Sequence, residues 1–204
     1  MYHQRVDQVT ASGVAAFVLA GGKSTRMGKD KAFLELRGHT LLARALDLAG
    51  TAAGDVRIVG EARKFAAFGP VIEDLYRDRG PLAAIHAALM STTAELNLIL
   101  AVDLPFLQPG FLAYLISEAR RTGAVVTVPH AGGGLQPLCA VYRRAFAEVA
   151  ERSLRQGTNK IDPLFDQVET RVLEAKELLA EGFAEEMFRN LNTPEEWEEA
   201  KVNH

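Results

Sequence analysis

The sequence predicts an α/β protein built on a single doubly wound, mostly parallel sheet with helices on both faces. Three observations carry this prediction. Short segments rich in Val, Ile and Leu alternate with longer segments of helical pattern. The early short segments are apolar almost throughout, as strands buried on both faces are. Proline near the start and glycine just past the end punctuate several of the helical segments.

The expected elements follow in order along the chain. We expect strands at residues 15–20, 55–60, 70–74, 96–103, 123–129, 136–142, 170–175 and 187–192. We expect helices at residues 40–50, 80–91, 109–123 and 143–157. Strand and helix units that alternate in this way predict a Rossmann-like sheet, in which ligands bind beyond the carboxyl ends of the strands.

The composition bounds the number of domains. The chain has 204 residues, of which 48% are hydrophobic and 24% are charged, the balance of an ordinary globular protein. That length supports one substantial core and is short for two. We expect a flexible, polar N-terminal segment at residues 1–13 and a single domain at residues 14–204.

Charge, hydropathy and cysteine content exclude several classes of partner. A formal net charge of −3 argues against nucleic acid. No apolar run approaches the roughly 18 residues of a membrane span. Cys139 is the single cysteine, so no disulfide forms within the chain, which fits a reducing cytoplasm. Because its neighbours form an apolar strand, we interpret Cys139 as a small buried hydrophobe rather than a nucleophile.

The segment FVLAGGKSTRMGKDKA, residues 17–32, predicts a phosphate-binding loop. Its glycine spacing matches neither the Walker A pattern nor the Rossmann fingerprint. Adjacent glycines nevertheless allow the backbone to approach an anion closely. Four basic residues against one acidic residue, Asp30, complement the charge of a nucleoside triphosphate. A solvated basic loop after a strand is the alternative.

This segment also resembles a known signature. LAGGKSTRMGKDKA is similar to the N-terminal motif of nucleotidyltransferases related to sugar-phosphate guanylyltransferases and cytidylyltransferases, and within them most closely to the molybdenum cofactor guanylyltransferases. The resemblance implies transfer of GMP from GTP to the terminal phosphate of molybdopterin. It implies nucleotide contacts from Leu19, Ala20, Gly21 and Gly22. It implies that Arg26 and Lys31 hold the phosphates and serve catalysis.

Asp103 ends an apolar strand and is the candidate metal ligand. A carboxylate at the end of a buried strand is costly unless it is compensated, and Mg²⁺ is a natural partner for it. A turn aspartate before Pro105 is the alternative. The family carries C-D-T-P here and this chain carries V-D-L-P, residues 102–105. The resemblance implies a magnesium-binding and catalytic role for Asp103, which also contacts the nucleotide.

Other positions carry over from the same resemblance. From its residues alone, the segment around Asp74 is typical of a turn and a helix cap. The resemblance implies that Asp74 contacts the nucleotide. Gln136 is implied on the acceptor side. Asn190 and Asn192 would share one face of a strand, near the metal and phosphates. Gly60 departs from the pattern, because the family often has a nucleotide-contacting asparagine there.

Three functions stay open from the sequence. The favoured one is the guanylyltransferase, since cytidylyl relatives tend to show L-A-A-G where this chain has tandem Gly21-Gly22. A molybdopterin cytidylyltransferase or a sugar- or polyol-phosphate nucleotidyltransferase is the first alternative. A non-catalytic module that binds a nucleotide or molybdopterin is the second. Implied partners are GTP, molybdopterin, and molybdoenzyme apoproteins or other proteins of molybdenum cofactor biosynthesis.

Overall fold

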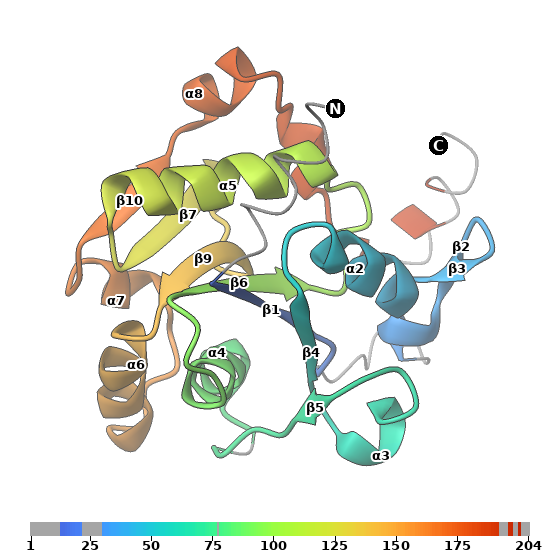
Figure 1. The fold of residues 1–204 in the computed structure, drawn as a ribbon, viewed down its shortest axis with the longest axis horizontal. Coiled ribbons are helices and arrows are strands. Elements are labelled where there is room, and N and C mark those ends of the chain that lie inside the picture. Colours follow the sequence, from blue (N-terminus) through green and yellow to red (C-terminus); the bar gives the residue numbers. More distant parts are fainter. Residues whose placement is uncertain (1–12, 22–29, 77, 192–195, 198–199, 201–204) are drawn as a thin grey trace.

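The computed structural model describes residues 13–21, 30–76, 78–191, 196–197 and 200. Its main feature is an eight-stranded sheet in the order β10-β7-β9-β6-β1-β4-β5, with β8 paired to β7 (Figure 1). The strands are β1 (Val14–Leu19), β4 (Asp55–Val59), β5 (Val71–Ile72), β6 (Leu96–Ala101), β7 (Val126–Ala131), β8 (Gly134–Leu135), β9 (Cys139–Arg143) and β10 (Thr170–Leu173).

The sheet is mixed and mostly parallel, as predicted. β1 runs parallel to both of its neighbours, β4 and β6, and β4 runs parallel to β5. β9 is inserted antiparallel between β6 and β7. The chain builds outward from β1 to β4 and β5, then crosses back to place β6 on the other side of β1. The switch point, where ligands bind in sheets of this kind, therefore lies between the carboxyl ends of β1 and β6.

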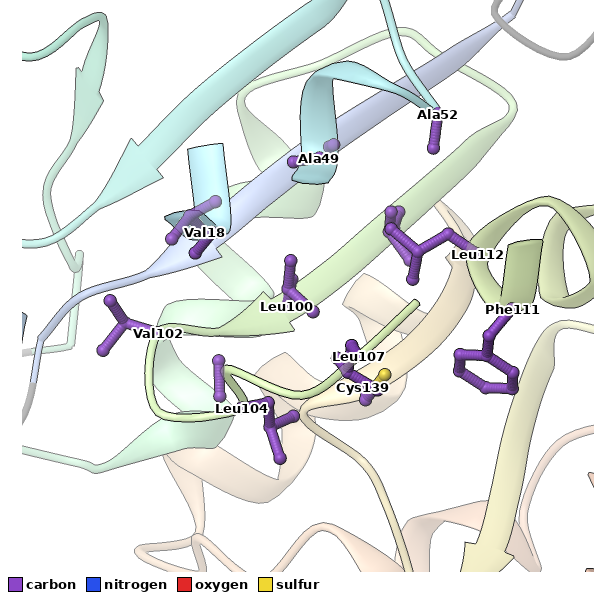
Figure 2. Packing of buried hydrophobic residues seen from close by; sticks show 14 of the residues in the cluster. Val18, Ala49, Ala52, Leu100, Val102, Leu104, Leu107, Phe111, Leu112 and Cys139 are labelled. Carbon is purple, nitrogen blue, oxygen red and sulfur yellow. The ribbon is translucent and has the colours of Figure 1, made fainter. Parts of the chain in front are cut away.

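Helices cover both faces of the sheet, which confirms the doubly wound prediction (Figure 1). α2 (Leu41–Gly50) and α5 (Pro109–Thr122) lie on one face, and α4 (Pro81–Met90) and α6 (Phe146–Arg155) lie on the other. Two hydrophobic clusters result. Val18 of β1 packs in the α2-side cluster with Leu100 of β6 (Figure 2), and Phe17 packs in the α4-side cluster. Successive side chains of one strand thus supply both cores.

Short elements complete the described chain. They are η1 (Lys31–Phe33), β2 (Glu35–Leu36), β3 (His39–Thr40), α3 (Ala62–Phe65), α7 (Asp162–Phe165), α8 (Ala175–Ala180) and η2 (Glu185–Phe188). Among the described residues, no helix combines the length and the apolar character that crossing a bilayer requires. Residues 1–12 of the expected N-terminal segment lie outside the described residues, and the domain boundaries stay a prediction.

The helix-end signals read from the sequence are present in the structure. α4 and α5 each begin with a proline at the first turn. The Thr40 hydroxyl accepts a hydrogen bond from the Ala43 backbone amide at 3.1 Å and caps α2. Gly123 follows α5 in the left-handed conformation, with φ 73°. Cys139 is fully buried, and burial raises the pKa of its thiol, as expected of a structural cysteine.

One predicted strand is wrong. The segment at 187–192 has no strand among its described residues; instead the one-turn 3₁₀ helix η2 ends at Phe188 and irregular backbone follows. The buried side chains are Met187, Phe188 and Leu191. Their spacing of one and then three residues is helical, whereas a strand would bury every second residue. The Phe188 ring packs edge-on against Phe111 of α5 at 5.2 Å between centroids, and this contact helps hold the turn in place.

We expect opposite effects on stability from alanine at two helix-end glycines. Gly123→Ala should lower the free energy of unfolding by about 1 kcal/mol, because a side chain is strained at positive φ. Gly50→Ala is the control, since Gly50 is helical and a Cβ there meets open space. It should be neutral or stabilising by up to about 1 kcal/mol. Urea unfolding measures both, and equal changes would contradict the left-handed cap.

Candidate functional site

The candidate site lies at the switch point of the sheet. Leu19 ends β1, and it is paired with Ala101 of β6 on one side and with Val59 of β4 on the other. The pairing continues past the strand ends, because the Val102 amide donates to the Leu19 carbonyl at 3.2 Å. This register brings the chain after β1 and the chain after β6 to the same edge. The sheet itself therefore brings Gly21, where the described chain after β1 stops, and Asp103 to the same edge.

The backbone at Ala20 and Gly21 is held by β4. The amides of both residues donate to the Val59 carbonyl, at 3.0 Å and 3.3 Å. Ala20 is buried and Gly21 is exposed at the sheet edge. These two amides are therefore already paired within the protein. Gly22 and Arg26, which the sequence also assigns to the nucleotide, lie outside the described residues.

Lys31 and Asp103 form the central ion pair of the site. The Lys31 ammonium lies 3.3 Å from Oδ2 of Asp103, although the two residues are 72 positions apart. Their side chains are 18% and 24% exposed, so the pair is sheltered and still open to a ligand. Lys31 begins η1, whose N-cap is Asp30: the Asp30 carboxylate accepts the Ala32 amide at 3.2 Å. The turn thus aims the lysine back at the sheet edge.

Asp74 brings a carboxylate without a partner to the same end of the sheet. It follows β5, the strand next to β4, by two residues. Its Oδ1 is buried and has no hydrogen-bond partner among the residues that the structure describes. Burial also raises the pKa of this carboxyl. An unsatisfied buried acceptor is costly in the free protein and is satisfied when a ligand donates an N–H or O–H group to it. Asp74 therefore has the environment of a ligand-binding residue.

The structure does not bring the described acceptor-side residues, Gln136 and Asn190, into contact with Lys31 or Asp103. The Gln136 side-chain amide donates to the Ala131 carbonyl at 2.8 Å and ties the segment after β8 to the end of β7. That side chain supports the loop. Asn190 is exposed and follows η2 in irregular backbone, so the strand geometry expected for it is wrong. Asn192 lies outside the described residues.

The carboxylates present fit magnesium in one specific way. Among the described residues, no group of three or more His, Cys, Asp or Glu side chains could enclose a metal ion. Mg²⁺ does not need such a cage, because proteins commonly hold it by one or two carboxylates and the phosphates of a substrate. Asp103 can supply one such carboxylate, since it lies beyond the end of β6 and its Oδ2 accepts a hydrogen bond from the Lys31 ammonium. A hard oxygen ligand beside a cationic side chain suits a metal–triphosphate complex.

The sequence did not reveal α3 as the support of this site. The Phe65 ring is buried and stacks on the Phe33 ring of η1, with 5.6 Å between the ring centroids. Lys64 reaches the Asp30 carboxylate at 3.5 Å, so α3 also holds the N-cap of η1. At its other end, the Ala62 amide donates to the Glu73 carboxylate at 3.0 Å, one residue before Asp74. The contacts with Phe33 and Asp30 join positions more than 30 residues apart, and no local pattern signals them.

Gly60 is explained by the same element. A Cβ at this position would lie 2.8 and 2.9 Å from two carbons of the Phe65 ring, and 3.5 Å from the Gly21 amide nitrogen. Real Cβ atoms essentially never approach so closely, so the ring and a side chain at position 60 exclude one another. The asparagine that the family often has here would clash with the Phe65 ring in its present position. In this chain Phe65 fills the space beside the bend at Gly21.

Comparison with known proteins places this geometry among nucleotidyltransferases. The family model described as a MobA-like NTP transferase domain matches residues 16–171. The molybdenum cofactor guanylyltransferase of Desulfosudis oleivorans is 37% identical over 192 residues, which cover 93% of this chain and 95% of the relative. A protein named probable molybdenum cofactor guanylyltransferase from Pelotomaculum thermopropionicum is 34% identical over 94% of this chain and 92% of its own length.

Solved structures are similar in the same sense. Molybdopterin-guanine dinucleotide biosynthesis protein A from Archaeoglobus fulgidus superposes with a TM-score of 0.82 at 27% identity, over 93% of this chain and 97% of the other. The 2-C-methyl-D-erythritol 4-phosphate cytidylyltransferase of Thermus thermophilus superposes with a TM-score of 0.70 at 19% identity, over 93% of this chain and 98% of the other. The second likeness is one of fold alone.

We expect Gly60→Ala to be destabilising because the new methyl group meets the Phe65 ring. Overpacking of this kind typically costs about 1–3 kcal/mol of unfolding free energy. Gly54→Ala is the matched control, since a Cβ there meets open space. Adding Phe65→Leu to Gly60→Ala should cost less than the sum of the single changes, because the clash is relieved. Urea unfolding of the four variants tests this, and strict additivity would contradict the contact.

Proposed function

We propose, because the chain belongs to the MobA-like NTP transferase family, that it transfers GMP from GTP to the terminal phosphate of molybdopterin and releases pyrophosphate. The resemblance carried by residues 19–32 is confirmed by family membership. The observation that carries the proposal is the ion pair of Lys31 and Asp103, 3.3 Å apart at the switch point of the sheet. It supplies a cation and a carboxylate where a nucleotide binds in sheets of this kind.

The proposed reaction is a displacement at phosphorus. An oxygen of the molybdopterin phosphate attacks the α-phosphorus of GTP, and a new P–O bond forms. The bond from the α-phosphorus to the oxygen that bridges it to the β-phosphorus breaks, and pyrophosphate leaves with the electron pair. The attacking phosphate is already a nucleophile, so the site needs no strong general base. Positioning and charge neutralisation therefore account for catalysis.

Each residue at the sheet edge has a role in this scheme. Lys31, together with Arg26, binds the β- and γ-phosphates and stabilises the charge that collects on the departing pyrophosphate. The backbone from Leu19 to Gly22 and the Asp74 carboxylate hold the nucleoside. Asp74 accepts a hydrogen bond from it through the oxygen that is unpartnered in the free protein. Phe65 and α3 hold the bend and η1 in register.

Asp103 is the residue that would hold Mg²⁺. When bound, the ion would neutralise phosphate charge as a Lewis acid. Lys31 orients the carboxylate through its contact with Oδ2. GTP and molybdopterin are the partners that this reaction requires. Hand-over of the product to apoproteins, and the cytoplasm as the compartment, stay predictions from the sequence.

The function is tested by assaying pyrophosphate release from GTP with molybdopterin and Mg²⁺, and by titrating GTP and CTP calorimetrically. We expect release that depends on both substrates and on Mg²⁺, and tighter binding of GTP than of CTP. Tighter CTP binding would instead identify the cytidylyl branch. Absence of release with each nucleotide and acceptor would support a binding module that lacks transferase activity.

We expect Lys31→Ala to lower turnover by about 10²–10³-fold, because loss of one charge-stabilising donor in a transition state has that effect. Lys176→Ala on α8 is the control, since it removes the same charge from an exposed position outside the site. The measurement is turnover with saturating GTP and molybdopterin. Turnover of Lys31→Ala equal to that of the control would remove Lys31 from the mechanism.

We expect Asp74→Asn to weaken GTP binding and to stabilise the free protein. Loss of a charged hydrogen-bond acceptor should raise the Kd for GTP about tenfold or more. Burial raises the pKa of the Asp74 carboxyl in the folded protein above its ordinary value of 3.8. At higher pH the ionised carboxylate therefore lowers the unfolding free energy of the unsubstituted protein. The gain in unfolding free energy should therefore appear at pH 7 and vanish below about pH 3.8. Asp166→Asn, at an exposed aspartate, is the control. Loss of stability at pH 7 would contradict this assignment.

A further inference from the structure

A groove runs along α2 beside the segment that follows Asp103. It consists of two adjoining hollows of about 330 and 430 Å³, which share Arg44, Pro105 and Leu107 as walls. Cavities of roughly 300–1,000 Å³ are those that bind small molecules. The first hollow lies along α2. The second opens between the β2–β3 hairpin, the 105–108 segment and η2.

Arg44 stands at the junction of the two hollows with its hydrogen-bonding capacity largely unused. Among the described residues, its polar contact is one long hydrogen bond, from Nη2 to the Pro105 carbonyl at 3.4 Å. Its Nε is buried and has no hydrogen-bond partner within the described part of the chain. A guanidinium has five N–H donors, and leaving them unpaired in a sheltered place is costly. An anion in the groove would satisfy them, and the carbonyl bond holds the guanidinium two residues from Asp103.

The second hollow has the walls of a site for a flat heterocycle. Phe106 and Met187 present an aromatic ring and a polarisable thioether, and Glu186 presents a carboxylate. Pterins carry an amino group and a ring N–H side by side, and a carboxylate accepts both. The Arg189 guanidinium lies 5.4 Å from the centroid of the Phe106 ring. This contact ties the segment that carries Asn190 to the same wall.

The groove and Asp74 lie toward opposite faces of the sheet. Leu36, Leu107 and Met187, which line the groove, pack in the α2-side cluster. Asp74 follows Ile72, which packs against the α4-side cluster. Displacement at phosphorus places the attacking and the leaving oxygens roughly in line on opposite sides of the phosphorus. An acceptor that enters from the groove and a nucleotide held near Asp74 would meet this requirement at Asp103.

We propose that this groove binds the acceptor, an anionic phosphorylated pterin, with Arg44 on its phosphate and the pterin ring between Phe106 and Met187. This assignment rests on the proposed function and names the acceptor site that it needs. Arg44 is then a binding residue specific to the acceptor. The acceptor enters on the α2 side of Asp103, away from the side on which the nucleotide is held.

The test compares two groove variants with a distant control. Arg44→Gln keeps a polar side chain, shorter than that of arginine, and removes its charge. Gln108→Trp blocks the second hollow from an exposed position. Arg152→Gln removes one charge from α6, on the other face of the sheet. We expect both groove variants to raise the KM for molybdopterin about tenfold to a hundredfold, with the Kd for GTP unchanged within twofold. The control should change neither.

Equilibrium dialysis of molybdopterin without GTP measures the site apart from turnover. Weaker pterin binding by both groove variants, but not by Arg152→Gln, supports the assignment. An unchanged KM and unchanged dialysis in both variants would overturn it, and so would a parallel loss of GTP binding. A wild-type protein that binds molybdopterin through Arg44 but releases no pyrophosphate would refute the proposed reaction and leave the groove in place.

Discussion

Leu19 and Ala101 end two parallel strands side by side, and the register of that pair decides which side chains beyond the strands can meet. The chain after β1 carries Lys31 and the chain after β6 carries Asp103. A shift of one residue would turn every side chain of β6 to the other face and remove the carboxylate from the edge. The 3.3 Å contact between lysine and aspartate is thus a consequence of how two buried strands pair.

The burial of those strands makes the register strict. β1 and β6 are buried along their whole length and supply side chains to a hydrophobic cluster on each face. A slipped strand would lose packing on both faces at once, which costs several kcal/mol in a close-packed interior. Stability and site geometry therefore have the same source. The part-exposed ion pair itself contributes little to stability and depends on the sheet for its placement.

The described segments at this edge are supported from outside the sheet by α3. An aromatic contact and an ion pair connect this four-residue helix to η1, and a hydrogen bond from its Ala62 amide to the Glu73 carboxylate connects it to the residue before Asp74. The Phe65 ring also closes the space at Gly60, so the bend at Gly21 is backed by a rigid wall. A reaction that relies on positioning rather than on a strong base benefits from this rigidity.

The sequence by itself determined the fold class and the four long helices, and it predicts site positions on the glycine loop and at Asp103. These features are local: apolar runs, proline and glycine at helix ends, and a motif of consecutive residues. The tertiary structure decided the rest. It showed that 187–192 is not a strand, that Gln136 supports a turn, and that Phe65 excludes a side chain at position 60. Each of these depends on contacts between residues far apart in the chain. A sequence pattern records which side chains prefer burial, and packing alone decides against which partner they are buried.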